Sequence, residues 1–166
     1  EHPAFLGHHA YDEPGVDSFD SIGALKKVYA KAFPDKSFFV NLYPSYSSTK
    51  SLGTSSGYEY YVQHYIDRVS PDLLSVDYYP LKGSAQKPVL YTGLLSDYEI
   101  YAENAKLYDI PFYAFIGTMG FTSAIRQPSI YDLRFMVNAA LMFGADGINH
   151  FTYWWPYELG AETDLT

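Results

Sequence analysis

The tetrapeptide "YDEP" (11–14) ends a short apolar run and is followed by a stretch with helical periodicity. Three related tetrapeptides follow it along the chain: "NLYP" (41–44), "DYYP" (77–80) and "YWWP" (153–156). Each closes a strand-like run and places aromatic or carboxylate residues just before a proline. Because proline cannot continue the backbone pairing inside a sheet, we expect the strands to end here and the chain to turn into loops.

The segments around these tetrapeptides alternate between two kinds of hydrophobic pattern. Strands are predicted over 5–11, 38–43, 73–79, 111–116 and 147–154. Helices are predicted over 17–32, 57–69, 98–108 and 129–143, with polar loops at 45–57, 82–88 and 117–128. The predicted order is βαβαβαβαβ, and the short apolar strands are typical of a parallel sheet covered by helices.

Two α/β architectures fit this alternation, a doubly wound sheet and a (β/α)8 barrel. A doubly wound sheet usually carries a glycine-rich phosphate turn after its first strand. Here the corresponding turn, "DEPGVDSF" (12–19), carries carboxylates that would repel a phosphate. We therefore predict an α/β fold of the TIM-barrel type, in which the carboxyl ends of the strands share one pocket.

Five strands cannot close an eight-stranded barrel. We expect residues 1–166 to form one incomplete barrel domain of about five parallel strands and four helices, equivalent to strands 4–8. Strands 1–3 and the final helix would then be missing from this segment. The remaining part of the barrel, or a second copy in a homo-oligomer, would complete it. A self-standing five-stranded sheet is the alternative.

Composition excludes several classes of partner. The chain carries 19 acidic and 11 basic side chains and has no cluster of Lys or Arg, so neither nucleic acid nor an anionic membrane surface is expected to bind. No apolar run is long enough to cross a bilayer. The absence of cysteine excludes disulfides and thiol catalysis. No signal peptide is visible, and the compartment stays open, with a secreted or periplasmic location among the options.

Two carboxylates are candidates for acid catalysis. Glu13 ends the first predicted strand among aromatic residues, where burial would raise its pKa. Asp77 would lie inside the barrel, because strand alternation places it opposite Leu74 and Val76. Glycoside hydrolysis needs one carboxylic acid and a second carboxylate that acts as nucleophile or activates water. The simpler alternatives are a helix cap for Glu13 and a salt bridge or loop cap for Asp77.

Polar and aromatic side chains near the strand ends are candidates for binding a sugar. Asn41 and Tyr43 share the predicted inward face of the second strand, where Asn41 would hydrogen-bond a hydroxyl group. The predicted stacking platforms are Tyr43, Tyr79, Trp154 and Trp155. Core packing is the alternative for each of these aromatic residues.

The histidines do not indicate a metal site. His8 and His9 are neighbours on a predicted strand and would point to opposite faces, and the sequence has no His-x3-His pair on a helix. A nucleophile elbow for Ser-His-Asp catalysis is also missing. We therefore predict neither a metal nor another cofactor.

Several motifs resemble the large clan of retaining glycoside hydrolases built on (β/α)8 barrels. "YDEP" resembles the Asn-Glu-Pro signature of their fourth strand, and "GADGINHFTYWWP" (144–156) resembles their last strand, where a tryptophan forms the floor of a sugar subsite. "SPDLLSVDYYPL" (70–81) resembles the sixth strand of barrel hydrolases related to β-galactosidases. The resemblance implies that Glu13 is the general acid/base. It also implies that Asp12, in place of the Asn, contacts the sugar hydroxyl beside the reacting carbon.

The chain departs from this clan in two places. Asp12 adds a carboxylate beside the expected acid. The predicted seventh strand, "PFYAFIGTMGF" (111–121), carries no carboxylate where the clan has its nucleophilic Glu. Three explanations follow: the nucleophile comes from elsewhere, the enzyme inverts, or the site no longer catalyses.

The sequence therefore supports several functional hypotheses. The first is a barrel glycoside hydrolase for a β-linked sugar, with Glu13 as the acid and Asp77 as its partner. The second is a barrel module that binds carbohydrate without cleaving it, and the third is a structural fragment whose aromatic residues pack against missing strands. Because the two carboxylates lie two strands apart and Asp is short, we expect a wide gap that favours inversion, although members of the clan retain.

Overall fold

The computed structural model describes residues 2, 4–84, 86–120 and 124–152. Five parallel strands form one sheet in the order β1-β2-β3-β6-β7. Their bounds are Gly7–Asp12 for β1, Ser37–Leu42 for β2, Leu74–Val76 for β3, Phe112–Gly117 for β6 and Gly147–Phe151 for β7. A separate antiparallel hairpin pairs β4 (Leu81–Gly83) with β5 (Pro88–Leu90).

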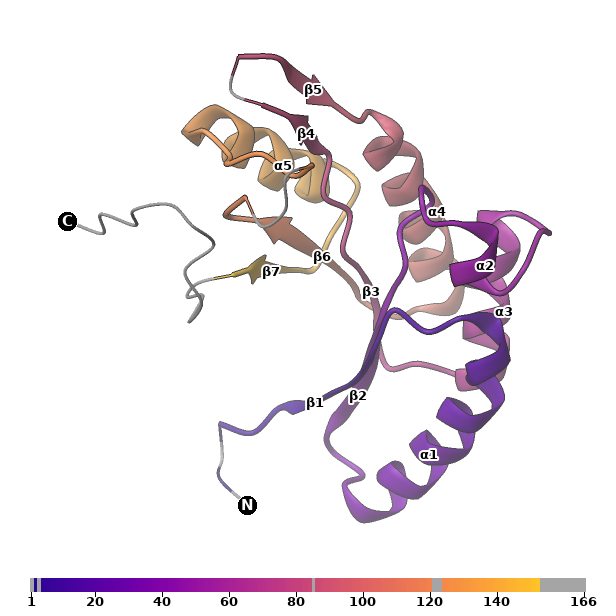
Figure 1. Ribbon diagram of the computed structural model, residues 1–166. Helices are drawn as coiled ribbons and strands as arrows, with labels where there is room; N and C mark the ends of the chain where they lie inside the picture. Colours follow the sequence, from indigo (N-terminus) through magenta and orange to yellow (C-terminus); the bar gives the residue numbers. More distant parts are fainter. Residues whose placement is uncertain (1, 3, 85, 121–123, 153–166) are drawn as a thin grey trace.

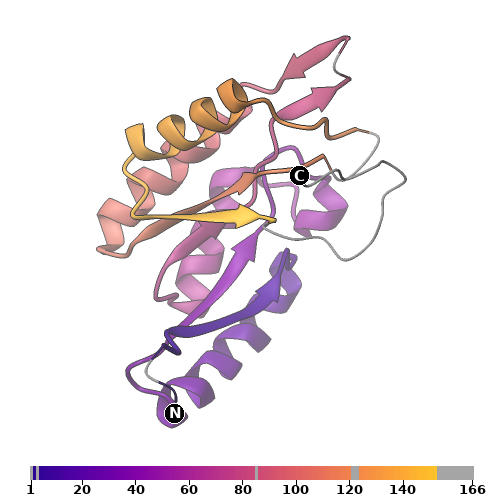
Figure 2. The ribbon, with the colours of Figure 1, turned by 90° about the vertical axis from the view of Figure 1, so that its left-hand side faces the viewer.

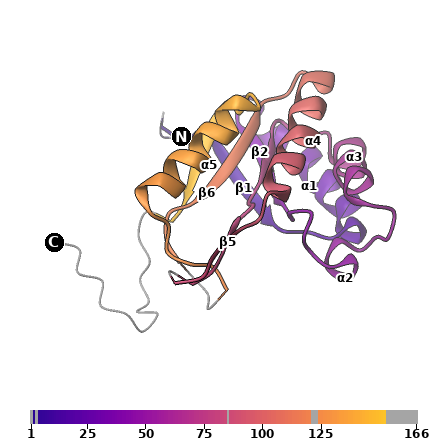
Figure 3. The same cartoon turned by 90° about the horizontal axis from the view of Figure 1, so that it is seen from above.

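The helices lie on the convex side of this sheet, which is curled into a half-barrel (Figure 1). They are α1 (Phe19–Ala32), α2 (Thr49–Leu52), α3 (Tyr58–Val69), α4 (Gly93–Tyr108) and α5 (Ile130–Met142), with a 3-10 turn at Val16–Ser18. Figure 2 shows the parallel strands from the side, and Figure 3 shows the arrangement from above. The predicted α/β class and the five parallel strands are confirmed. The strands that the structure describes form a half-barrel and not a closed (β/α)8 barrel.

The core lies between the sheet and the helices. Every second residue of the central strands faces the helices and is buried: Phe38, Val40, Leu42, Leu74, Val76, Phe112, Ala114 and Ile116. The largest helix side chains that meet them are Phe19, Tyr61, Tyr65, Tyr98, Tyr101 and Met136. Burial of this apolar surface, worth roughly 25 cal/mol per Å², is the main force that holds the helices on the convex side.

The other face of the same strands is concave and carries polar residues. Asn41 and Ser75 point to this face and are almost fully buried. The Ser75 hydroxyl donates a hydrogen bond of 3.0 Å to the Asn41 side-chain oxygen. The sheet therefore separates an apolar layer from a polar one, as period-2 alternation requires.

A β-bulge in β1 changes which side chains reach the concave face. His9 pairs with Phe39, but the register then shifts, so that Tyr11 pairs with Val40 and Asp12 with Asn41. Paired residues of neighbouring parallel strands point to the same face. The bulge therefore places both His9 and Asp12 on the concave face, which strict alternation would not do.

Several predicted element boundaries were wrong. The helix expected to begin at residue 98 begins at Gly93, because the apolar face of α4 extends back to the buried Leu94. The predicted loop 45–57 contains α2, whose N-cap Ser48 accepts a hydrogen bond from the backbone of Ser51. The predicted loop 82–88 belongs to the β4–β5 hairpin. None of the helices that the structure describes is long and apolar enough to cross a membrane.

Candidate functional site

A pocket of about 500 Å³ opens on the concave face at the carboxyl ends of the strands. Four strands of the sheet line it directly, and the segment that follows β3 supplies further side chains. The lining consists of His9, Asp12, Glu13, Asn41, Tyr46, Asp77, Tyr79, Lys82, Phe115, Ala124, Ile125 and Phe151. In parallel α/β folds this end of the sheet is where substrates bind.

Glu13 is held in the pocket by a strained backbone. It has φ of 47°, in the left-handed region that a residue with a Cβ rarely adopts. Its backbone N–H donates to the Asn41 carbonyl at 2.8 Å, and the next carbonyl, of Pro14, accepts from the Tyr61 hydroxyl at 2.7 Å. Such strain persists only where surrounding contacts over-determine it, and it concentrates at functional sites.

Asp77 follows the last residue of β3 and is 8% exposed. Its carboxyl group forms a hydrogen bond with the carboxyl group of Glu13. The Oδ1 atom of Asp77 is buried and has no hydrogen-bond partner among the residues that the structure describes. Two carboxyl groups from the ends of β1 and β3 therefore meet directly, across the intervening strand β2.

Burial and like charge raise the pKa of both carboxyl groups. Burial is the main cause for Asp77, and the negative charges of Glu13 and Asp12 raise its pKa further. The pKa of Glu13 is raised by burial and by Asp12, while the hydrogen bond from Asp77 opposes this shift. Burial and the hydrogen bond between the two groups therefore favour the protonated form of Asp77 more strongly than that of Glu13.

Asp12 is the third carboxylate and is oriented by its neighbours. The Asn41 side-chain amide donates to Asp12 Oδ1 at 3.3 Å, and His9 Nε2 lies 3.7 Å from the same oxygen. Because the Asn41 oxygen already accepts from Ser75, its amide nitrogen is directed toward Asp12. A polar chain thus runs from Ser75 through Asn41 to the edge of the pocket.

Aromatic rings form the wall of the pocket opposite β1. Tyr79 is 9% exposed, and its ring lies 5.8 Å from that of Phe151. The backbone N–H of Tyr79 donates to the Tyr46 hydroxyl, and the Lys82 ammonium group lies 4.5 Å from the centroid of the Tyr46 ring. Rings of this kind offer a flat apolar face to one side of a sugar while hydroxyl groups bind its edge.

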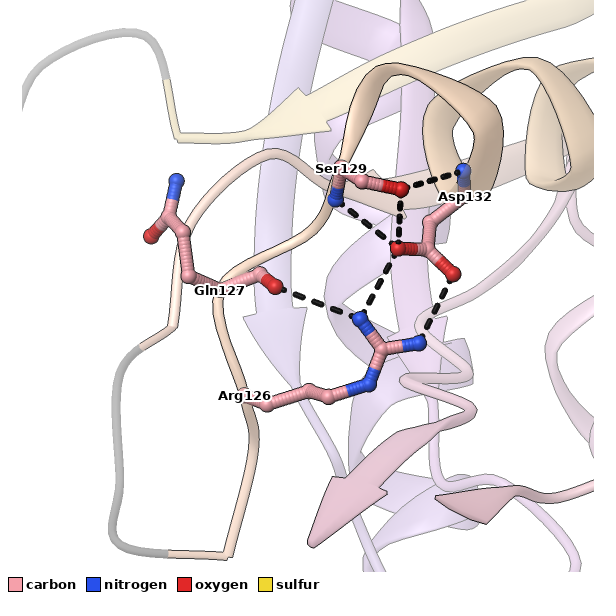
Figure 4. A network of polar contacts seen from close by, with 4 residues as sticks. All are labelled: Arg126, Gln127, Ser129 and Asp132. Atoms are coloured by element: carbon pink, nitrogen blue, oxygen red, sulfur yellow. Dashed lines mark hydrogen bonds and ion pairs between the residues drawn. The ribbon is translucent and has the colours of Figure 1, made fainter. Parts of the chain in front are cut away.

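A salt-bridged loop supports the rim of the pocket beside Ile125. The backbone N–H of Arg126 donates to the Leu81 carbonyl at 3.1 Å, which ties the β6–α5 loop to the hairpin. The Arg126 guanidinium binds both carboxylate oxygens of Asp132 at 2.8 and 2.7 Å (Figure 4). Asp132 also completes a capping box with Ser129 at the start of α5.

The structure brings most of the predicted site residues together. Glu13, Asp77, Asp12, Asn41 and Tyr79 all line the pocket. Trp154 and Trp155 lie outside the described residues, as does the end of the last predicted strand.

Tyr43 does not line the pocket, in contrast to the expectation that it would share the face of Asn41. Strand β2 ends at Leu42, and the backbone of Tyr43 is bound from the helix side. Its carbonyl accepts from the Tyr58 hydroxyl at 2.6 Å, and its N–H donates to the Tyr61 hydroxyl at 3.3 Å. The two tyrosines of α3 therefore fix the backbone of Tyr43. Burial is the main cause that raises the pKa of its hydroxyl, which stays close enough to Glu13, Asp12 and Asp77 for their charges to raise this pKa further.

The expected wide gap between the two carboxylates was also wrong. Glu13 and Asp77 are in hydrogen-bonding contact. The left-handed backbone at Glu13 follows the end of β1, and it bends the chain over β2 toward Asp77. A calculation from strand spacing alone omits this bend.

Sequence reasoning missed His9, Tyr46, Lys82, Phe115 and Phe151 as pocket residues. In the sequence His9 stands out only as a candidate metal ligand, and the bulge that aligns it with Asp12 has no clear sequence signal. Tyr46 and Lys82 lie in segments read as loops, and only the long polar insertions after their strands could have drawn attention to them. Among the residues that the structure describes, no three His, Asp or Glu side chains are grouped as metal ligands.

Comparison with known proteins supports the fold more than the function. No protein-family model matches the sequence, and no curated protein matches it by sequence. The structure is similar to the crystal structure of a "putative alpha-L-fucosidase" from Bacteroides thetaiotaomicron, with a TM-score of 0.63 and 14% sequence identity. The match covers 91% of this chain and 49% of that one, so this chain spans about half the length of that protein. At this identity the similarity shows the fold alone, a curled parallel half-barrel of the kind found in a glycoside hydrolase.

Proposed function

We propose that the pocket is the carbohydrate site of a glycoside hydrolase-like barrel, with Glu13 and Asp77 as its acid–base pair. The observation that carries this proposal is the contact between a half-buried and a buried carboxyl group, Glu13 and Asp77, at the carboxyl end of a parallel sheet. Aromatic side chains line the same pocket, as a sugar site requires. Two carboxyl groups with separated proton affinities are what glycoside hydrolysis uses.

We assign the proton to Asp77 and the negative charge to Glu13. This reverses the roles expected from the sequence, because Asp77 is the more deeply buried of the two. Asp77 would protonate the oxygen of the leaving group, and Glu13 would attack the anomeric carbon or activate a water molecule. No carboxylate is needed on β6 in this scheme, since Glu13 takes the part of the second carboxylate.

The scheme requires substrate to separate the pair. Retaining glycosidases hold their carboxyl groups roughly 5–5.5 Å apart and inverting ones roughly 6.5–9.5 Å. The hydrogen-bonded contact between Glu13 and Asp77 is shorter than either. We propose that the glycosidic oxygen takes over the hydrogen bond that Asp77 now donates to Glu13. A small outward shift of Glu13 then favours the retaining distance.

A panel of aryl glycosides tests the proposal. The panel should contain β-linked galactosides and glucosides, which the sequence resemblance suggests, and α-L-fucosides, which the name of the structural neighbour suggests. Wild-type protein is compared with Glu13→Gln, Asp77→Asn and the control Asp35→Asn, whose side chain is exposed and remote from the pocket lining. Hydrolysis that both pocket variants abolish, and the control retains, supports the assignment. Equal hydrolysis by all four proteins would remove Glu13 and Asp77 from the mechanism.

A second candidate function is carbohydrate binding without cleavage. The direct contact between Glu13 and Asp77 favours it, because the structure has no gap between the two carboxyl groups for a glycosidic bond. Calorimetry with the oligosaccharides that correspond to the panel distinguishes the two functions. Binding without turnover favours this second function, and turnover by the purified protein eliminates it.

A further inference from the structure

Lys82 is the one Lys or Arg side chain among the residues that line the pocket. It lies on β4, in the hairpin that follows the Asp77 segment, and is half-buried. The other charged residues of the lining are the acids Asp12, Glu13 and Asp77. The pocket therefore combines an acidic end with a single cation.

Two tyrosine rings hold the Lys82 ammonium group in place. Its Nζ lies 4.5 Å from the ring centroid of Tyr46 and 5.6 Å from that of Tyr91. The backbone of Lys82 also pairs with that of Ile125 on the β6–α5 loop. Cation–π contacts restrict where a lysine head group can go without neutralising its charge. The backbone of the hairpin and the two tyrosine rings together therefore fix the position of this charge.

In the part of the chain that the structure describes, no carboxylate forms an ion pair with this ammonium group. Burial lowers the pKa of Lys82, and no neighbouring negative charge opposes this shift. A partly desolvated cation without a counter-charge is unfavourable, and an anionic ligand would supply the missing charge.

Tyr46 connects the cation to the carboxyl pair. Its ring carries the ammonium group of Lys82, and its hydroxyl is close enough to Asp77 and Glu13 for their charges to raise its pKa. Lys82, Tyr46 and the two carboxyl groups all line the same pocket, so a single ligand can contact the cation and the carboxyl pair.

From this geometry we infer that the pocket takes an acidic sugar whose carboxylate or sulfate group binds Lys82. The inference rests on the proposed carbohydrate function. Three acidic side chains at one end repel an anionic sugar, so a single fixed cation at the other end also sets its orientation. The glycosidic oxygen is then directed to the Asp77–Glu13 end. Neutral sugars leave the cation without a counter-charge and bind more weakly.

Titration calorimetry on the whole chain tests this inference without depending on catalysis. The probes are gluco-, galacto- and fuco-oligosaccharides, the C6 uronates of the first two, and sulfate esters of all three. Uronates and sulfate esters separate the two possible anions. The variants are Lys82→Met, which keeps the length of the side chain, and Lys82→Arg, which keeps the charge. Lys87→Met is the matched control, because Lys87 lies on the same hairpin but outside the pocket lining.

We expect wild-type protein to bind at least one acidic sugar about tenfold or more tightly than its neutral counterpart. Lys82→Met should abolish that preference, Lys82→Arg should keep most of it, and Lys87→Met should not change it. Circular dichroism and thermal unfolding establish that each variant is folded. Equal binding of neutral and acidic sugars by the wild type, or an acidic preference that survives Lys82→Met, overturns this inference alone. Failure of every sugar to bind overturns the proposed function together with it.

Discussion

Asp77 and Asp132 are the same residue type, and their surroundings shift their pKa values in opposite directions. Asp77 is buried against Glu13, and its pKa is raised. Asp132 is bound by Arg126 and Ser129, and these hydrogen bonds hold its pKa well below the usual range (Figure 4). The surroundings therefore favour the protonated form of Asp77 and the ionised form of Asp132.

The difference between Asp77 and Asp132 shows that the groups bound to a carboxylate determine its role. Arg126 binds Asp132 with both terminal guanidinium nitrogens, so a positive charge compensates the carboxylate, which fixes a loop and a helix end. Asp77 has another acid, Glu13, as its partner, and its Oδ1 atom has no hydrogen-bond partner among the described residues. An arrangement that is costly for folding indicates use in binding or catalysis.

The strongest test of the comparison is Asp77→Asn. We expect a decrease of about 10²–10⁴-fold in kcat/KM on any glycoside that the wild type hydrolyses, since the proton donor is lost. The free energy of unfolding should not decrease, because the amide introduced at this position can still donate a hydrogen bond to Glu13 and the substitution buries no new charge. Steady-state kinetics and thermal unfolding measure the two effects. Loss of stability with unchanged kcat/KM would make Asp77 a structural residue like Asp132.

The reciprocal test removes Arg126 from Asp132. We expect Arg126→Met to lower the free energy of unfolding by about 2–4 kcal/mol, because it leaves a poorly exposed carboxylate without its cation. The wild-type pair contributes stability above the unfolded pKa of Asp, near 4, and loses it as pH falls further, since the folded pKa is lowered. Urea unfolding at pH 7 and pH 3 measures both effects. An unchanged free energy at pH 7 contradicts the structural role, and Ser129→Ala separates the cap, worth about 1 kcal/mol, from the ion pair.

A third carboxylate, Asp97 on α4, sharpens the comparison because it is buried without an acidic or a basic partner. Burial raises its pKa to about 6, although the backbone N–H of Ser45 donates to it at 2.8 Å. Its protonated form stabilises the fold fully below pH 4, and this contribution is lost as pH rises through about 6. We expect Asp97→Asn to be about 1–2 kcal/mol more stable than wild type at pH 8 and close to it at pH 4. Chemical unfolding at both pH values measures this difference. If Asp97→Asn is less stable than wild type at pH 8, the ionised form of Asp97 stabilises the fold and the prediction is wrong.

The smallest expected effect concerns Asp12, which adds negative charge to the Glu13–Asp77 pair. Asp12→Asn removes a charge that raises the pKa of both groups, so both pKa values should fall. We expect the two limbs of the pH–rate profile to move down by less than about one pH unit. Asp35→Asn serves as the control, with no shift expected. A move toward higher pH would mean that Asp12 acts mainly through its hydrogen bond from Asn41 and not through its charge.

The class of fold, and the end of the sheet where the pocket lies, follow from sequence patterns that need no tertiary contact. Apolar runs with period 2 and period 3.6 identify the strands and helices, and the prolines at 14, 44 and 80 mark where strands end. The carboxyl ends of parallel strands meet at one edge of the sheet, and this does not depend on the conformation of the loops. For this reason Glu13, Asp77, Asp12, Asn41 and Tyr79 could all be assigned to one pocket before any coordinates.

The tertiary structure alone decided how the side chains meet within that pocket. The bulge in β1 sends His9 and Asp12 to the same face, and the left-handed backbone at Glu13 brings its carboxyl group to Asp77. Both depend on contacts with β2, which lies far along the chain. Lys82 likewise reaches the pocket through the packing of a hairpin on Tyr46. Local sequence patterns indicate the hydrophobic period of an element and the residues that form turns. The raised pKa of Asp77, in contrast, depends on burial and on charges contributed by residues distant in sequence.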